Sequence, residues 1–377
     1  MIDAIGEAHR RMDGVVLLGA EINFAGSRPE VSKASIDWTA VKRRTNLCSI
    51  ALRVSPYSGP FRADDPVAQN IIDVSKELIN DARIHGVALE EFQFDFDCAQ
   101  KNLGGYRTWL RTLRMVVRPT RFVITALPAW LDDPQFPELL RETDSYVLQV
   151  HSVPLANASG ASLCNTALAR QWIDKAAKLG QPFSIALPTY RCSAGYGSDG
   201  KLLSVAMDSV QPVWPPGTHI LEFTSNADEI ASLLDELIKK RPKEFRDVIW
   251  YRIPIATDTR NWRWVTLDAV MAGRHPKHKL DIVQEGTDLI DLSIFNAGES
   301  DEQFSSNVMA TWKFADLTAA DALSGWNVRS ESKHAVFSAT GPGVRLPPGA
   351  SRKIGWLRFD QPTNLEVELS KNGESFR

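Results

Sequence analysis

The chain has 377 residues, of which 44% are hydrophobic and 24% are charged, and its formal net charge is −3. This length and hydrophobic content can bury a large core and are typical of one large domain joined to a smaller one. The absence of a basic excess argues against a nucleic-acid-binding protein, and no apolar stretch is long enough to cross a membrane.

Eight short segments rich in β-branched or aromatic residues follow one another along the chain, and each is followed by a segment with room for a helix. We expect strands at 15–24, 48–55, 92–97, 122–128, 146–152, 183–190, 220–225 and 248–255. Helical periodicity marks 68–85, 106–117, 167–179 and 227–240. Eight β-then-α units in roughly 250 residues are the usual content of a TIM (β/α)8 barrel. We therefore predict an α/β fold with a TIM barrel over residues 1–273.

The stretch Phe92-Gln93-Phe94-Asp95-Phe96-Asp97 alternates strictly between aromatic and polar residues. Side chains alternate faces along a strand, so the polar residues converge on the face opposite the phenylalanines. Two carboxylates on one strand face are costly to bury unless they are paired, hydrogen-bonded or used in chemistry. This strand is where we place the active site.

Applied to all eight segments, the same alternation predicts which side chains point to the barrel axis near the carboxyl ends of the strands, where barrel enzymes keep their sites. An inert barrel would fill these positions with Val, Ile and Leu. The predicted inner residues are Glu21, Arg53, Asp95, Asp97, Gln149, His151, Tyr190, Glu222, Trp250 and Arg252.

Structural uses of these residues stay open beside the functional ones. His151 can be a core histidine, and Asp95 and Asp97 can cap the loop that follows their strand. A buried ion-pair network would also use the arginines without any substrate. Its members would be Arg53 and Arg252 with Glu21, Glu222 or Gln93 as partners, and Glu222 with Arg252 on the adjacent strand.

Several motifs resemble a bacterial family designated only as a domain of unknown function, DUF3142, with a glycosidase-like TIM barrel. They are QFDFDCA at 93–99, ITALPAWL at 124–131, TDSYVLQVHS at 143–152, ALPTYRC at 186–192, and IWYRIPI followed by NWRW within 249–264. The resemblance supports the barrel and places Asp95, Asp97, Gln149, His151, Tyr190, Glu222 and Arg252 among the characteristic positions. DFD also resembles the DxDxE motif of chitinase-like barrels, but Ala99 stands where their final Glu would be.

The leading functional hypothesis is a glycoside hydrolase or related carbohydrate-active enzyme, acting on an oligo- or polysaccharide without a cofactor. Two carboxyl groups would act, one protonated to protonate the leaving oxygen and one ionised as nucleophile or base. Asp95 and Glu222 are the predicted pair, with Asp97 tuning Asp95 by like-charge repulsion. The predicted substrate-binding residues are Glu21, Arg53, Gln149, His151, Tyr190, Trp250 and Arg252.

Two other classes of function remain open. A metal-dependent hydrolase would use Asp95, Asp97, His151 and Glu222 as ligands, but the first strand carries Glu21-Ile22-Asn23 where such barrels typically show HxH. A non-catalytic carbohydrate-binding or scaffold protein would keep the cleft without using its acids.

Four cysteines bear on the compartment. Cys164 and Cys192 follow neighbouring predicted strands, so we expect a disulfide between them and hence a periplasmic or secreted protein. The first residues show no charged segment followed by an apolar run, so a cytoplasmic location also stays open.

After about residue 280 the helical periodicity stops and alternating segments are separated by Gly, Pro and Asn turns. We predict a small β-sandwich-like accessory domain over 280–377, joined by the linker 273–278. Such a domain would bind carbohydrate or brace the barrel, and bracing is the simpler expectation.

Overall fold

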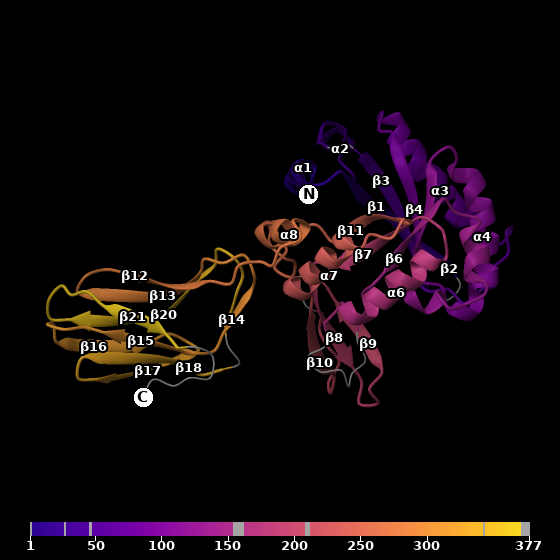
Figure 1. Cartoon of the computed structure of the whole chain (residues 1–377). Coiled ribbons are helices and arrows are strands. Elements are labelled where there is room, and N and C mark those ends of the chain that lie inside the picture. Colours follow the sequence, from indigo (N-terminus) through magenta and orange to yellow (C-terminus); the bar gives the residue numbers. More distant parts are fainter. Residues whose placement is uncertain are drawn as a thin grey trace. The chain divides into compact units, whose positions relative to one another are not determined.

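The structure is a computed structural model that describes residues 2–25, 28–44, 47–153, 162–207, 212–341 and 344–370. The chain forms two compact units, Met1–Asn261 and Trp262–Arg377 (Figure 1). The boundary precedes the predicted linker, because helix α8 (Trp264–Met271) is part of the second unit. No described helix combines the length and apolar character needed to cross a bilayer.

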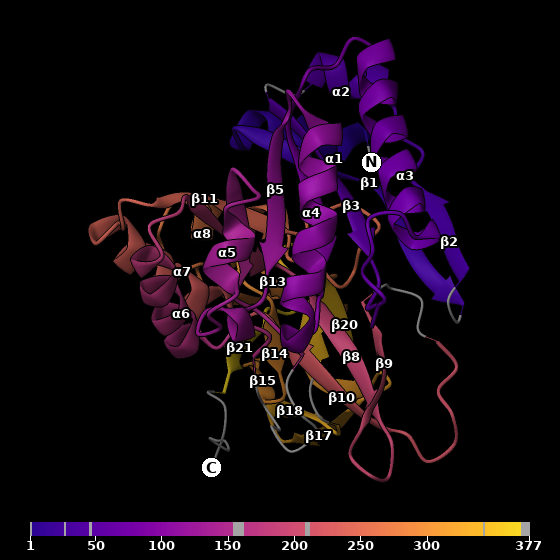
Figure 2. The ribbon, with the colours of Figure 1, turned by 90° about the vertical axis from the view of Figure 1, so that its right-hand side faces the viewer.

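The main sheet of the first unit has eight strands in the order β11-β7-β6-β5-β4-β3-β1-β2. Neighbouring strands are parallel except β1 and β2, which form an antiparallel hairpin at one edge. The sheet is curled and open, as Figures 1 and 2 show. Its strands are β1 (Gly14–Ala25), β2 (Arg28–Lys33), β3 (Leu47–Val54), β4 (Leu89–Phe96), β5 (Arg121–Ala126), β6 (Ser145–Gln149), β7 (Phe183–Pro188) and β11 (Phe245–Tyr251).

The predicted closure into a barrel is wrong. The segment expected as the seventh barrel strand is β10 (His219–Thr224), which belongs to a separate antiparallel sheet with β8 (Arg191–Tyr196) and β9 (Leu202–Ala206). Only Thr189 and Tyr190 separate β7 in the main sheet from β8 in the second sheet. Strand β10 then forms its backbone hydrogen bonds with β8 and not with a strand of the main sheet. As a result, β11 pairs directly with β7 and ends the main sheet.

Helices follow the strands much as the periodicity predicts. Polar caps start several of them: Asp65 Oδ1 accepts from the Ala68 amide at 2.7 Å, and Asn165 Oδ1 accepts from the Leu168 amide at 3.1 Å. In the first unit the α-helices are α1 (Ile2–Arg11), α2 (Trp38–Arg44), α3 (Pro66–Ile84), α4 (Leu103–Val117), α5 (Phe136–Leu140), α6 (Thr166–Lys178) and α7 (Ala227–Lys239). Short 3-10 turns are η1 (Gln100–Asn102) and η2 (Pro128–Trp130).

The phenylalanines of β4 confirm the alternation that the sequence predicts. Phe92, Phe94 and Phe96 are fully buried. Phe96 packs against helix α4, with ring centroids 5.1 Å from Tyr106 and 5.5 Å from Trp109. Helices α3 and α4 lie side by side on this outer face of the sheet (Figures 1 and 2). The opposite face of β4 therefore carries the polar residues.

The second unit contains two four-stranded antiparallel sheets, ordered β12-β13-β20-β16 and β17-β18-β15-β21, and the pair β14-β19. Both large sheets contribute to one hydrophobic core, which includes Leu292, Phe337, Leu357 and Trp326. The strands are β12 (Leu280–Glu285), β13 (Leu289–Asn296), β14 (Glu302–Phe304), β15 (Asn307–Thr311), β16 (Leu317–Ala322), β17 (Trp326–Glu331), β18 (His334–Ala339), β19 (Val344–Leu346), β20 (Ser351–Phe359) and β21 (Glu366–Leu369).

Candidate active site

A row of alternating charges crosses three adjacent strands near their carboxyl ends. In the register of the sheet Glu21 on β1 stands beside Arg53 on β3, and Arg53 stands beside Asp95 on β4. Parallel strands in register place such side chains on one face, so the sequence prediction that these three converge is confirmed by the pairing. The row reads negative, positive, negative.

Asp95 on β4 and Asp97, which follows the strand, differ in their surroundings. The Thr125 hydroxyl on the neighbouring strand β5 donates a hydrogen bond to Asp95 Oδ1 at 2.7 Å. A donor at this distance stabilises a carboxylate in its charged form. Asp97 lies just beyond the strand end, and its Oδ1 is buried without a hydrogen-bond partner among the described residues.

Burial raises the pKa of Asp97, the negative charge of Asp95 raises it further, and the Arg53 guanidinium acts against both. An acid with a raised pKa keeps its proton to higher pH than an ordinary aspartate. The end of this strand therefore presents a carboxyl with a raised pKa beside a second carboxyl that has a hydrogen-bond donor.

Arg53 is the cation of this site. Burial alone lowers its pKa, but Asp95, Tyr251, Asp97 and Glu21 together raise it overall, so the guanidinium stays charged. Within the described ranges, no hydrogen bond or ion pair shorter than 4 Å involves its side chain. Its donors therefore remain free for a ligand.

Three rings pack together beside the charged row. His151 stacks on Tyr251 with centroids 6.0 Å apart, and the Tyr190 ring lies edge-on to both at 6.2 and 5.7 Å. His151 Nδ1 is 3.1 Å from the Ala186 carbonyl oxygen, so Nδ1 carries the proton and Nε2 is left as an acceptor. Burial lowers the pKa of His151, against the opposing effects of that carbonyl and of Asp95, which favours a neutral ring.

The inner face of β11 is not the one that the sequence predicts. Ile249 packs against a small cluster formed by Val123, Val147 and Ala186, so residues 249 and 251 share the inner face. Tyr251 therefore joins the site, and the predicted inward position of Trp250 is wrong. The run Val-Ile-Trp-Tyr is apolar throughout, so its alternation gave no signal. Gln149 lies on the same face as Val147, at the end of β6.

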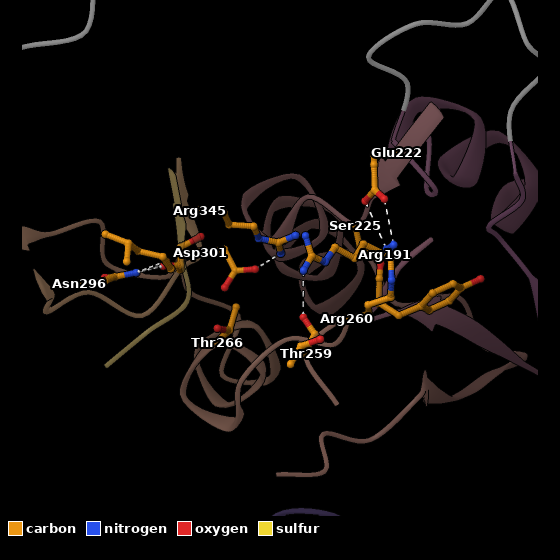
Figure 3. A network of polar contacts seen from close by, with 12 residues as sticks. Arg191, Glu222, Ser225, Thr259, Arg260, Thr266, Asn296, Asp301 and Arg345 are labelled. Atoms are coloured by element: carbon orange, nitrogen blue, oxygen red, sulfur yellow. Dashed lines mark hydrogen bonds and ion pairs between the residues drawn. The ribbon is translucent and has the colours of Figure 1, made fainter. Parts of the chain in front are cut away.

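Glu222 lies on β10 in the antiparallel sheet, so its predicted place on a barrel strand is wrong. Its carboxylate accepts hydrogen bonds from Arg260 at 2.9 and 3.3 Å (Figure 3). It also accepts a hydrogen bond from the Ser193 hydroxyl. The Glu222 side chain is 50% exposed, whereas that of Arg260 is 8% exposed. Arg260 was missed because it follows β11 in a loop with no periodic pattern.

Arg252 also has a partner that the sequence did not suggest. Its guanidinium pairs with Asp258 at 2.6 Å and donates to the Met207 carbonyl at 3.0 Å. The ion pair between Glu222 and Arg252, which the sequence left open as a structural alternative, is replaced by the pair of Glu222 with Arg260. Arg191 donates to the Thr259 carbonyl at 3.1 Å, so several arginines hold the 256–261 loop in place (Figure 3).

The predicted disulfide between Cys164 and Cys192 is wrong, because all four cysteines are free and buried. Cys192 is in strand β8 rather than in a loop, and it packs with Tyr190, Ala194 and Phe223. Burial raises the pKa of Cys164 to about 12 and that of Cys192 to about 11. The expectation of an oxidising compartment depended on this bridge and loses its support.

In the part of the chain that the structure describes, no three His, Cys, Asp or Glu side chains gather closely enough to hold a metal ion. Asp95, Asp97, His151 and Glu222 therefore do not form the ligand set of a metal-dependent hydrolase, since Glu222 pairs with Arg260 instead.

Comparison with protein families identifies the first unit. Residues 62–256 match the domain of unknown function DUF3142. The chain belongs to the DUF3142 family. A second domain of unknown function, DUF8456, matches residues 280–360 of the second unit. No curated protein sequence matches this DUF3142 protein.

Solved structures similar to this DUF3142 protein include three bacterial enzymes. A chitinase from Chromobacterium violaceum ATCC 12472 has 13% identity and a TM-score of 0.48, covering 72% of this chain and 95% of that one. The Bacillus cereus spore cortex-lytic enzyme SleL has 10% identity and a TM-score of 0.48, with coverages of 73% and 70%. Chitinase ChiA74 from Bacillus thuringiensis has 10% identity and a TM-score of 0.39, with coverages of 86% and 80%. At these scores the reaction has to be argued from the site itself.

Proposed function

We propose that the inner face of β1, β3, β4, β6 and β11 is the active site of a glycoside hydrolase or a closely related carbohydrate-active enzyme. The observation that carries this proposal is the pair of carboxyls on β4. The pKa of Asp97 is raised because the carboxyl is buried beside a like charge, whereas Asp95 has a hydroxyl donor and an arginine neighbour. Glycoside hydrolysis uses two carboxyl groups in different roles, and contrasting surroundings are the physical basis for that division.

In this mechanism Asp97 is the general acid. As the bond between the anomeric carbon and the leaving oxygen breaks, the Asp97 proton passes to that oxygen and leaves a neutral alcohol. Asp95 takes a proton from the water that attacks the anomeric carbon, so the oxygen of that water forms the new bond. Each turnover ends with proton exchange between the two aspartates and solvent.

The separation of the two carboxyl groups, and not the rise of the backbone between their residues, decides between retention and inversion of configuration. Retaining enzymes hold their carboxyls about 5–5.5 Å apart. Inverting enzymes hold their carboxyls roughly 6.5–9.5 Å apart, which leaves room for the attacking water.

The remaining residues of the face supply binding. Arg53 has free donors for sugar hydroxyls, and Glu21 and Gln149 add acceptors or donors on the same face. Tyr190, Tyr251 and His151 provide an apolar surface, which suits the C–H face of a pyranose ring. In this proposal Glu222, Arg252 and Trp250 are structural residues, because of the partners and faces described above.

A screen of polysaccharide oligomers, analysed by mass spectrometry, tests the proposal. The wild-type protein should release shorter products from at least one of them, and Asp97→Asn should reduce that rate about 10²–10⁴-fold. Glu90→Gln is a matched control on the same strand, since Glu90 is exposed and paired with Arg121 at 3.4 Å. Binding of an oligomer without any cleavage by the wild type would instead support a non-catalytic sugar-binding protein.

A further inference from the structure

A tryptophan stands on the outer face of one sheet of the second unit. In the sheet β12-β13-β20-β16, Ile290, Leu292 and Leu357 are buried in the core. Side chains alternate along each strand, so Asp291 on β13 and Trp356 on β20 point away from that core. The Trp356 side chain is partly exposed, whereas Trp312 and Trp326 of the same unit are 4% exposed.

Trp356 has a carboxylate on each side. It stands opposite Asp291 on β13 and opposite Asp321 on β16, and Glu285 on β12 stands opposite Asp291 in turn. Directly opposed residues have Cβ atoms about 4.5–5.5 Å apart, so the two aspartates flank Trp356 on the outer face of the sheet. The outer row across the four strands is thus Glu285, Asp291, Trp356 and Asp321.

Two cations on the same strand complete the surroundings of the ring. The Arg358 guanidinium lies over the Trp356 ring, 5.9 Å from its centroid, and Lys353 forms an ion pair with Asp291. The Asp291 side chain remains 33% exposed in that pair, and Asp321 is exposed, with its Oδ1 accepting a hydrogen bond from the Ala322 amide at 2.9 Å. The indole is therefore an apolar ring with a carboxylate on each neighbouring strand and a guanidinium over it.

We propose that this outer row, called here the Trp356 platform, binds a neutral polysaccharide. A pyranose presents an apolar C–H face that stacks on an indole, while its equatorial hydroxyls point outward to acceptors such as Asp291 and Asp321. The acids of the row outnumber the adjacent cations Lys353 and Arg358, which disfavours a polyanion such as nucleic acid or an acidic polymer. A protein partner would have to desolvate these charges around a single ring.

The platform does not depend on the proposed active site, because it lies wholly within the second unit. Its test is sedimentation of the full chain with insoluble chitin, cellulose and xylan, which measures retained protein at several polymer concentrations. The wild type should bind at least one polymer, and Trp356→Ala should weaken that binding about tenfold or more. Asp321→Ala, a change at an exposed position, should weaken it about threefold.

Phe314→Ala is the matched control, since Phe314 is 88% exposed in the same unit and lies outside the row. It should bind as the wild type does, and all variants should keep the wild-type circular dichroism spectrum. Absence of binding to every polymer, or equal loss in Trp356→Ala and Phe314→Ala, would overturn the proposal. Cleavage of soluble oligomers is scored separately, so failure of the platform and failure of the active site give different results.

Discussion

Two acids of the first unit occupy contrasting surroundings: Glu222, which the sequence predicts as one of the two catalytic carboxyls, and Asp97, which it predicts to tune Asp95. Asp97 is partly buried, has a like charge beside it and leaves one oxygen without a partner among the described residues. Glu222 is half exposed, and Arg260 and Ser193 satisfy its carboxylate. An acid is poised for proton transfer when its surroundings leave its charge uncompensated, whereas a paired acid contributes to structure.

The largest expected difference between the two acids is in the rate of hydrolysis when each is replaced by its amide. Asp97→Asn should lower the rate of hydrolysis about 10²–10⁴-fold, because the general acid is lost, and Glu222→Gln should stay within about threefold of wild type. Steady-state kinetics on the best oligomer of the screen measures both. A larger loss in Glu222→Gln than in Asp97→Asn would reverse our assignment.

For the free energy of unfolding we expect the opposite order, with a larger loss in Glu222→Gln than in Asp97→Asn. Glu222→Gln leaves the buried Arg260 guanidinium without its counter-charge, so we expect the free energy of unfolding to fall by about 1–3 kcal/mol. Asp97→Asn replaces a poorly compensated acid by a neutral group of the same shape and should not destabilise the protein at neutral pH. Urea denaturation of the three proteins measures the difference. Equal losses in both variants would remove the distinction.

Thr125 sharpens the account of the β4 pair. Thr125→Val removes the hydroxyl that donates to Asp95 but keeps the shape, so we expect about a tenfold lower rate at neutral pH. A wild-type circular dichroism spectrum of Thr125→Val separates this loss of rate from a loss of folding. Thr125→Ser should restore most of the rate. An unchanged rate in Thr125→Val would show that the hydroxyl does not act through Asp95.

The pH dependence of stability provides an independent check on Asp97. Its pKa is raised in the folded protein by burial and then by Asp95, so the folded state binds more protons than the unfolded chain between the ordinary value of 3.8 and the raised pKa. Stability contributed by this group is therefore lost as pH rises through that interval. The free energy of unfolding of Asp97→Asn minus that of wild type should increase from about pH 4 to about pH 7. A constant difference would contradict the raised pKa.

The smallest expected difference is in thiol reactivity, which should be similar for the cysteine next to Asp97 and the cysteine near Glu222. Cys98 follows Asp97 and Cys192 lies near Glu222, and burial raises the pKa of both thiols, to about 12 and about 11. Thiol titration should find four groups in denatured protein and slow reaction in folded protein. Two groups in the denatured, unreduced protein would restore the disulfide.

The sequence by itself determined the strands of the main sheet and much of its polar face. Alternation along 92–97 identified the buried phenylalanines, and the same rule placed Glu21, Arg53 and Asp95 on one face. These features are local, because the period of a strand lies in a few consecutive residues and burial selects apolar side chains at that period.

Only the tertiary structure decided which strands pair and which acids are compensated. The segment 220–225 has the composition of a barrel strand, but in the structure it pairs with β8 in a separate antiparallel sheet. Glu222 therefore lies outside the parallel sheet. The residues before Tyr251 are all apolar, so the sequence does not indicate which of them face inward. The packing of Ile249 against Val123 and Val147 shows that residues 249 and 251 do. Strand pairing and pKa values depend on contacts between residues that are far apart in the chain. Such contacts leave no periodic pattern in the sequence.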